Sequence, residues 1–347
     1  MINIGIAGVG FMGMVHYLSY LKIEGVRVVA LADHLPERLA GDWTGIKGNF
    51  GPPGEQMDLT GVATFASPEE MITSGEVDVI DICLPPAAHT QLALAALAAG
   101  KHVFCEKPIA LHIEQADRLI AAAEIADRQL LIGHVLPYFP EYAWALQVIG
   151  SGDYGQVVSA SFERVVSDPA WLANYWDADA FGGPLLDLHV HDAHFICLAL
   201  GMPARVTTQG SLRNGLAEHW RSLLQYDTGG PRVLATSGVL NQPSRPFLHG
   251  FEIQLQRATI SFEFAVETLA DGDQAAYTRP PTLYPNDRPA ERIELGEGDP
   301  MRAFEAELRH ASQVFAGKTE PGPLNATLAR NALTLCQLQA AYLLDQQ

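Results

Sequence analysis

The sequence is poor in the features that build metal knuckles, disulfide frameworks and membrane spans. Its four cysteines are Cys83, Cys105, Cys197 and Cys336, and no two form a CxxC pair, so neither a zinc knuckle nor a disulfide framework is indicated. No run of about 18 apolar residues is available to span a bilayer. The first residues lack the basic segment and cleavage site of a secretory signal. We therefore expect a cytoplasmic protein with reduced thiols and no membrane partner.

Positive charge is also scarce. The chain has 22 basic and 40 acidic residues, for a net charge of −18. Such a field repels phosphate backbones, so we expect no nucleic-acid partner. An anionic small substrate would need a local cationic pocket, whereas a neutral sugar or polyol would not.

The N-terminus carries a GxGxxG motif, made by Gly8, Gly10 and Gly13, in an ordered context. An apolar strand is predicted at 2–7 before it and a helix at 12–21 after it. A second buried strand then ends in Asp33. This order of strand, glycine turn, helix, strand and acid predicts a dinucleotide-binding unit.

Each part of this motif has a physical task. Gly8 permits the tight turn, Gly10 lets the backbone approach a pyrophosphate, and Gly13 lets the helix pack close to the strand. The helix N-terminus at Phe11 and Met12 offers backbone N–H groups to phosphates. Asp33 would accept hydrogen bonds from the adenosine ribose and repel a 2′-phosphate, so NAD is favoured over NADP as the cofactor.

The same alternation of strands and helices continues to residue 134. Strands are predicted at 77–86, 102–108 and 129–136, and helices at 89–100 and 113–128. Ligands bind beyond the carboxyl ends of strands in such sheets. Pro85, Glu106 and Lys107 fall at those ends. We therefore predict an α/β protein whose residues 1–134 form a Rossmann domain.

Beyond residue 135, alternating apolar runs predict further strands, with helices before and after them. Residues 270–300, rich in Pro, Gly and Asp, are predicted to be a loop or sheet edge. Helices are predicted from a capping Asp299 with Pro300 at the first helical position, and over 324–344. The remaining predicted elements are a connecting helix at 139–152 and strands at 156–165, 205–212, 221–227, 232–240, 250–256 and 258–264.

Four motifs in this order resemble a known family. They are "LPPAAH" (84–89), "GKHVFCEKP" (100–108), "GGPLLDLHVHDAHF" (182–195) and "FEAELRHASQVFAGKTEPGP" (304–323). Together with GxGxxG they resemble the Gfo/Idh/MocA family of glucose–fructose oxidoreductases and inositol dehydrogenases. The resemblance implies a Rossmann domain and, over residues 135–347, a second α/β domain for substrate binding and oligomerisation with a large open mixed or antiparallel sheet. It also implies a bound nicotinamide, and oxidation or reduction of a sugar, cyclitol or related carbinol.

The resemblance also implies site residues. Lys107 matches the lysine at the nicotinamide and substrate, and Asp187 and His191 match the Asp-x-x-x-His pair facing it. Glu106 and His89 match positions lining the nicotinamide side of the cofactor site. The stretch departs from the family motif at Pro184, His189 and His194, and at Pro137 in "GHVLPYFPEY". These departures surround the substrate and leave its class open.

The stretch 182–195 allows three interpretations: acid/base chemistry for hydride transfer, a metal site, or structural histidines. A helix from about 184 to 200 would put Asp187, His191 and His194 on one face and turn His189 away. A strand would instead group Asp187, His189 and His191 and favour a metal. Pro184 and Gly201 favour the helix, so we predict no metal ligands here.

The resulting hypothesis is an NAD-dependent dehydrogenase acting on a CH–OH carbon of a carbohydrate-like substrate. His191 would take the hydroxyl proton, Lys107 would stabilise the developing alkoxide, and Asp187 would orient the substrate. Substrate contacts are predicted for Lys107, Tyr138, Trp176, Asp187, His191 and His194. Three alternatives remain open: a glycosidase or lyase that uses bound NAD cyclically, a non-catalytic NAD-binding regulator, and a metal-assisted variant. An exposed second-domain sheet would need covering, which predicts a homodimer or homotetramer.

Overall fold

The computed structural model describes residues 1–48, 50–169, 172, 174–296 and 299–345. By contacts the chain divides into two units: unit 1 is Met1–Phe139 with Gly298–Arg330, and unit 2 is Pro140–Glu297 with Asn331–Gln347. The sequence placed the boundary at 134/135 and assigned everything beyond it to the second domain. Residues 298–330 return to unit 1 because helix α8 (Pro300–Phe315) packs on helix α1 (Phe11–Tyr20).

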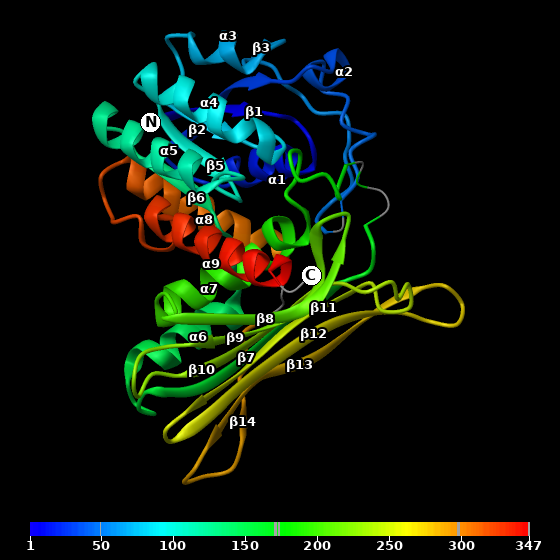
Figure 1. Cartoon of the computed structure of the whole chain (residues 1–347). Helices are drawn as coiled ribbons and strands as arrows, with labels where there is room; N and C mark the ends of the chain where they lie inside the picture. The colour runs from blue at the N-terminus through cyan, green and yellow to red at the C-terminus, as the bar shows by residue number, and fades with distance from the viewer. Residues whose placement is uncertain (49, 170–171, 173, 297–298, 346–347) are drawn as a thin grey trace. The chain divides into compact units, whose positions relative to one another are not determined.

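Unit 1 is built on a six-stranded parallel sheet with the order β3-β2-β1-β4-β5-β6 (Figure 1). Its core strands are apolar and buried, as Ile4, Ile6 and Ile80 at 0% exposure illustrate. The strand order reverses direction between β1 and β4, so right-handed crossovers place the helices on both faces of the sheet. This confirms the predicted Rossmann architecture. The strands are β1 (Ile2–Ala7), β2 (Val26–Ala32), β3 (Ala63–Phe65), β4 (Val79–Ile82), β5 (His102–Glu106) and β6 (Leu130–Gly133).

The helices of unit 1 follow from local signals in the sequence. Helix α8 begins where predicted: Asp299 Oδ1 accepts the Met301 N–H at 2.9 Å and Pro300 occupies the first turn. The short elements between β2 and β4 were not predicted. The other helices are α2 (Pro36–Leu39), α3 (Pro68–Ile72), α4 (Pro86–Ala98), α5 (Ile113–Ala126), and the 3-10 turns η1 (Leu136–Tyr138) and η3 (Gly322–Leu324).

Unit 2 carries an eight-stranded sheet with the order β14-β13-β12-β11-β7-β10-β9-β8. The pair β7–β10 is parallel and the other pairs are antiparallel, so the predicted mixed sheet is confirmed. The strands are β7 (Val157–Val166), β8 (Arg205–Arg213), β9 (Leu216–Gln225), β10 (Arg232–Val239), β11 (Phe247–Leu255), β12 (Ala258–Thr268), β13 (Gln274–Pro285) and β14 (Glu291–Arg292).

Helices α6 (Pro140–Ser151) and α7 (Val190–Leu200) lie against one face of this sheet (Figure 1). On β7, Phe162 and Arg164 point to that face and are buried, whereas Ser161 and Glu163 are exposed. A buried ion pair fastens α7: Arg164 Nε and Nη2 donate to the Asp192 carboxylate at 2.6 and 3.1 Å. Helix α9 (Ala326–Leu344) contains the division between the units, at Arg330/Asn331.

The loop predicted for 270–300 is wrong over β13, a strand of 12 residues. Its register places Thr282 opposite Ser261 and Arg279 opposite Glu263. Pro280 and Pro281 therefore share the place opposite a single residue, which is a bulge, where proline is tolerated within a sheet. The alternative prediction, a sheet edge, agrees better with the structure, because only the two-residue strand β14 lies beyond β13 in the described part of the sheet. Positions 297–298 of the predicted loop lie outside the described residues.

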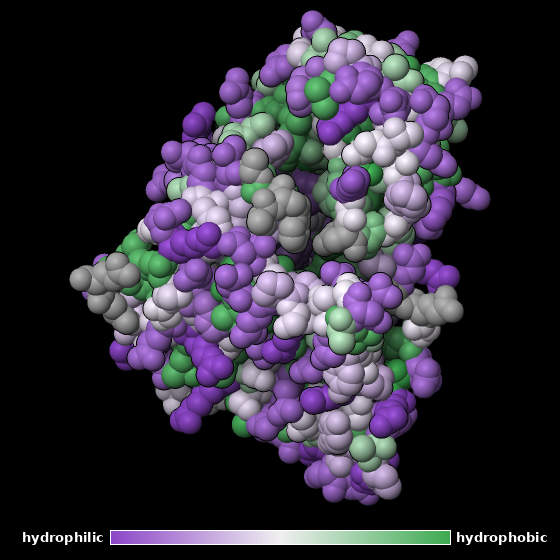
Figure 2. All heavy atoms as spheres, turned by 90° about the vertical axis from the view of Figure 1, so that its right-hand side faces the viewer, coloured by the Kyte–Doolittle hydropathy of each residue, from purple (hydrophilic) through white to green (hydrophobic). Residues whose placement is uncertain are grey.

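The surface agrees with the charge composition. Figure 2 shows hydrophilic residues over most of the face drawn, with hydrophobic ones scattered among them. Among the described residues, every helix is too short or too polar to cross a membrane.

Candidate functional site

The glycine turn of unit 1 is shaped by close backbone approach. Gly8 has φ +94°, and a Cβ there would lie 2.8 Å from the Cys83 carbonyl oxygen. A Cβ on Gly13 would lie 1.9 Å from the Gly8 carbonyl oxygen. Gly10, the N-cap of α1, faces open space, since its nearest neighbour would be Arg38 Nη1 at 4.0 Å. The turn thus leaves room at the helix N-terminus, and it fits the pyrophosphate of a dinucleotide.

Phe11 and Met12 open helix α1, but their side chains are engaged in packing. The Phe11 ring meets Phe50 edge-on at 4.8 Å between centroids, and Met12 packs against the cluster around Phe304. What these two residues can offer a phosphate is their backbone N–H groups, which lie in the first turn of the helix.

Asp33 follows β2 and is only 5% exposed. Its Oδ2 accepts the Val9 N–H at 2.7 Å and its Oδ1 accepts the Leu35 N–H at 2.9 Å. Arg38 Nη1 lies 3.3 Å from the same Oδ2. The carboxylate therefore ties the glycine turn to the end of β2 and has a cation beside it. Arg38 belongs to none of the predicted motifs.

The predicted residues at the ends of β4 and β5 lie close together in unit 1. Lys107 is half-buried and follows the buried Glu106. Glu106 Oε2 accepts the Lys107 backbone N–H at 3.2 Å. His89 is 0% exposed and its ring contacts the carbonyl oxygens of Pro108 and Leu84. Pro85, the N-cap of α4, is exposed. Lys107 and Pro85 are thus accessible to a ligand here, whereas the buried His89 ring contacts the backbone of neighbouring residues.

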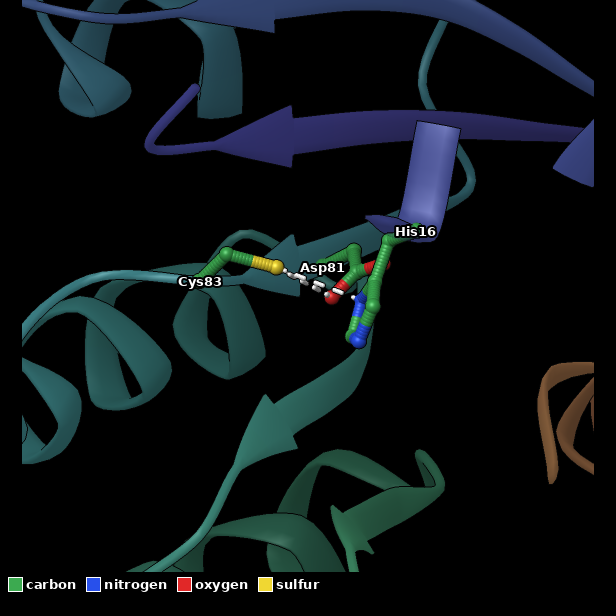
Figure 3. A group of neighbouring side chains, drawn as sticks. All are labelled: His16, Asp81 and Cys83. Atoms are coloured by element: carbon green, nitrogen blue, oxygen red, sulfur yellow. Dashed lines mark hydrogen bonds and ion pairs between the residues drawn. The ribbon is translucent and has the colours of Figure 1, made fainter. Parts of the chain in front are cut away.

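A buried cluster below this edge was missed by the sequence analysis. His16 of α1, Asp81 of β4 and Cys83 just beyond β4 converge, as Figure 3 shows. His16 Nδ1 lies 2.9 Å from Asp81 Oδ2 and 3.2 Å from Cys83 Sγ. Asp81, a charged residue inside an otherwise apolar strand, was the available signal. His16 offered none, because its partners are distant in sequence.

These three side chains are the one group of metal-ligating types that the described part of the chain brings within 4.8 Å. Their distances are those of hydrogen bonds, which account for the arrangement without an ion. Burial raises the pKa of the Cys83 thiol, which also disfavours the thiolate that a metal requires. The residues of the 182–195 stretch do not form such a group.

The stretch 182–195 is helical, as predicted, but its first turn is a π-helix (Leu185–His189) that runs into α7. Asp187 and His191 are half-buried and present surface, whereas His189 and His194 are 1% and 0% exposed. The His189 ring meets Trp220 edge-on at 5.6 Å. Burial lowers the pKa of His189 to about 4. His194, predicted to contact substrate, offers no surface to a ligand in this structure.

The two aromatic residues predicted to contact the substrate already have partners. Tyr138 of unit 1 has its hydroxyl 2.6 Å from His310 Nδ1. Trp176 of unit 2 donates to Asp168 Oδ1 at 3.2 Å, and the Arg213 guanidinium lies 4.4 Å above its ring. Trp176, Asp168 and Arg213 line a hollow of about 390 Å³.

Two family models match the chain. One, described as "Oxidoreductase family, NAD-binding Rossmann fold", matches residues 2–134, and the GFO/IDH/MocA C-terminal domain matches residues 142–261.

The chain is also similar to curated relatives and to solved structures. It is 28% identical over 192 residues to myo-inositol 2-dehydrogenase of Thermotoga maritima, covering 55% of this chain and 52% of that protein. An uncharacterized oxidoreductase of Rhizobium meliloti is 30% identical over 194 residues, 55% of this chain and 54% of its own. The chain thus matches about half the length of these relatives. An NAD-binding oxidoreductase structure from Klebsiella pneumoniae aligns with a TM-score of 0.78 at 21% identity, over 100% of this chain and 98% of that one.

Proposed function

Since the chain belongs to the Gfo/Idh/MocA oxidoreductase family, with its NAD-binding Rossmann fold, we propose that it is an NAD-dependent dehydrogenase. Its reaction transfers a hydride between the nicotinamide and a CH–OH carbon of a sugar, glycoside, cyclitol or related polyol. The observation that carries this proposal is the edge of the unit 1 sheet, where the glycine turn, Asp33 and Lys107 all follow the ends of parallel strands.

The cofactor would be held by residues of unit 1. The N–H groups of Phe11 and Met12 would meet the pyrophosphate in the space before Gly10. Asp33 would accept from the adenosine ribose hydroxyls, and its charge would oppose a 2′-phosphate. NAD is therefore preferred, with Arg38 as the residue that could accommodate NADP. When bound, the nicotinamide supplies the hydride acceptor or donor.

The chain's own side chains would manage the proton and the charge on the substrate oxygen. The Lys107 ammonium would donate to that oxygen and stabilise the alkoxide as it develops. The His191 imidazole would take the hydroxyl proton on a ring nitrogen. Asp187, half-buried and four residues earlier, would accept from a substrate hydroxyl and orient it. The exposures of these residues permit the roles, since each presents surface in its own unit.

A neutral polyhydroxy substrate suits the strongly acidic chain, because it needs no cationic pocket. Two observations support this class. The names of relatives include myo-inositol 2-dehydrogenase and 1,5-anhydro-D-fructose reductase, and Trp176 lines a hollow in which the Arg213 cation is paired with Asp168.

The test is NADH formation, measured by absorbance, against a panel of sugars, glycosides and cyclitols. We expect turnover with at least one polyol, and His191→Ala and Lys107→Ala to lower kcat about 10²–10⁴-fold, the range for loss of a general base or of its electrostatic partner. Product formation without net NADH would replace this proposal with cyclic use of NAD. No turnover with any member of the panel, in either direction of the reaction, would leave an NAD-binding protein without this chemistry.

We also propose that the protein is a homo-oligomer through the uncovered face of the unit 2 sheet. Leu223 on β9 lies directly opposite Leu234 on β10, and the two are 38% and 40% exposed. Apolar side chains adjacent on an open sheet face favour burial against a second copy.

A further inference from the structure

Two histidines from different helices contact the turn that follows β5. The turn consists of Glu106, Lys107 and Pro108, and only Lys107 presents more than a small part of its surface. His16 reaches the turn from α1 and His89 reaches it from α4. Both histidines are 0% exposed. Two wholly buried imidazoles thus hold the residues on either side of Lys107.

His16 acts on the Glu106 side. Its Nε2 lies 3.1 Å from Glu106 Oε1 and its Nδ1 lies 2.9 Å from Asp81 Oδ2. A carboxylate accepts hydrogen bonds and does not donate them, so both contacts are made when both ring nitrogens carry protons. Glu106 Oε2 in turn accepts the Lys107 N–H at 3.2 Å. A continuous path of hydrogen bonds therefore runs from Asp81 through His16 and Glu106 to the backbone of Lys107.

His89 acts on the Pro108 side. Its Nδ1 lies 2.9 Å from the Pro108 carbonyl oxygen, and its Nε2 lies 2.8 Å from the Leu84 carbonyl oxygen. Burial lowers the pKa of His89, and a neutral imidazole carries one N–H, so in its Nδ1–H tautomer the ring donates to Pro108 in the turn after β5 and contacts the Leu84 carbonyl oxygen in the loop after β4. Those two segments flank the strand ends at which ligands bind in this fold.

We propose that His16 and His89 are positioning residues, which together fix the turn that carries Lys107 and so hold its ammonium group in place for the reaction. This inference rests on the proposed role of Lys107 in catalysis. Buried polar groups cost stability unless they are satisfied, and apolar side chains would fill the same space at less cost. Both hydrogen-bond networks end on residues that flank Lys107, one on Glu106 and the other on Pro108. A positioning role requires such contacts.

The protonation state of His16 is consistent with its two hydrogen bonds to carboxylates. Burial, the largest single influence, opposes protonation, but the interactions with Asp81 and Cys83 together outweigh it, and the pKa of His16 is raised well above 6.5. The groups around it are Tyr20 on α1, Asp81 on β4, Cys83 beyond β4, Glu106 on β5 and Glu307 on α8. A doubly protonated ring can donate to Asp81 and Glu106 at once.

The test uses amide isosteres, because each keeps one of the two ring nitrogens as a donor. Glutamine extends to about the Nε2 position and asparagine to about the Nδ1 position. His16→Gln keeps the bond to Glu106, whereas His16→Asn loses it. His89→Asn keeps the bond to Pro108, whereas His89→Gln loses it. Each pair therefore contains a variant and its matched control with similar disruption of the core.

Two readouts are needed, and one of them does not depend on activity. The five lysines of the sequence allow selective ¹⁵N-lysine labelling, with the Lys107 amide signal identified by Lys107→Arg. We expect His16→Asn and His89→Gln to shift that signal and to lower kcat about 10–100-fold, with KM and NAD affinity changed less than about 3-fold. Their matched controls should keep both the signal and at least half of kcat.

The outcomes separate this inference from the proposed function. If the amide signal follows the isosteres while Lys107→Arg leaves turnover intact, the histidines hold the turn but the catalytic role of Lys107 is wrong, and the positioning proposal fails with it. If Lys107→Arg abolishes turnover but the two members of each pair behave alike, the histidines are only structural and the proposal is overturned alone. Should His16→Asn not fold, Asp81→Asn, which keeps the side-chain shape but removes the anionic partner of His16 Nδ1, must shift the Lys107 signal, because Asp81 is joined to the turn through His16.

Discussion

At the scale of single residues, the Asp33 carboxylate makes three contacts. It holds the Val9 N–H, caps the start of the segment at Leu35, and pairs with Arg38. The sequence identified Asp33 from its place after the second strand. Arg38 could not be identified in this way, because its proximity to Asp33 depends on the short helix α2, for which the sequence carries no strong periodic signal.

We expect Asp33→Ala to relax the preference for NAD and strengthen NADP binding by about 10-fold or more, since Arg38 loses its anionic partner and becomes available to a 2′-phosphate. Titration of both cofactors, followed by intrinsic fluorescence, measures this. In the double variant Asp33→Ala/Arg38→Ala the gain for NADP should disappear. Tighter binding of NADP than of NAD by the unaltered chain would contradict the argument.

Glu307 on α8 is a buried acid of a different kind. It is 0% exposed, and neither carboxyl oxygen has a hydrogen-bond partner among the described residues. Burial, with Glu106 nearby, raises its pKa well above 4.5. The folded state therefore holds this proton where the unfolded state has released it. Stability falls as the pH rises from about 4.5 toward the raised value.

Replacing Glu307 by Gln removes this proton dependence while keeping the shape of the neutral acid. We expect Glu307→Gln to match the unaltered chain in Tm near pH 4.5 and to exceed it at pH 8, by about 2–4 °C for each kcal/mol recovered. Thermal unfolding at a series of pH values measures the difference. A variant that is less stable at every pH would show that the carboxyl group has a stabilising partner.

At the scale of elements, the helix after residue 184 was predicted from Pro184 and Gly201, and α7 indeed ends at the Gly201 cap. The predicted grouping of Asp187, His191 and His194 on one face holds for a regular α-helix, whereas Leu185–His189 form a π-helix. No periodicity of apolar residues signals such a turn. The separation of His189 from His191 nevertheless holds, because Trp220 on β9 receives the His189 ring.

His189 should therefore affect stability rather than chemistry. We expect His189→Ala to lower the free energy of unfolding by about 2–5 kcal/mol, as large-to-small changes in a core do, with kcat within about 3-fold of the unaltered chain. Denaturant unfolding and steady-state kinetics measure the two effects. Loss of kcat to the extent seen for His191→Ala, in a folded variant, would contradict this division of roles.

The pH dependence of His189 has a defined sign. Its pKa is lowered to about 4 by burial, so the folded state holds it neutral. Its contribution to stability is present above about 6.5 and is lost as the pH falls toward 4. His189→Ala should accordingly flatten the loss of stability between pH 6.5 and 4.

At the scale of the whole molecule, the order of elements was predictable because both halves carry strong local patterns. Buried strands bounded by Gly and Pro indicated the parallel sheet, and alternating strands indicated the second sheet. The return of α8 to unit 1 was not predictable, because its helix signal at Asp299 and Pro300 says nothing about which core receives its apolar face. The pairing of His16 with Asp81 and Glu106 was hidden for the same reason, since tertiary packing alone brings those residues together.

The uncovered sheet face gives the last prediction. On β7 the residues of this face, Ser161 and Glu163, are polar, whereas Leu223 and Leu234 form an apolar pair on the neighbouring strands. A charge placed in that pair would lose its hydration if a second copy covered it. We expect Leu234→Asp to convert a dimer or tetramer into a smaller species at micromolar concentration, as measured by light scattering. Ile125→Asp, which makes the same change of charge at an exposed apolar residue on α5 of unit 1, is the matched control. An unaltered chain that is already monomeric, or a Leu234→Asp variant that keeps its full assembly, would place the interface elsewhere or remove it.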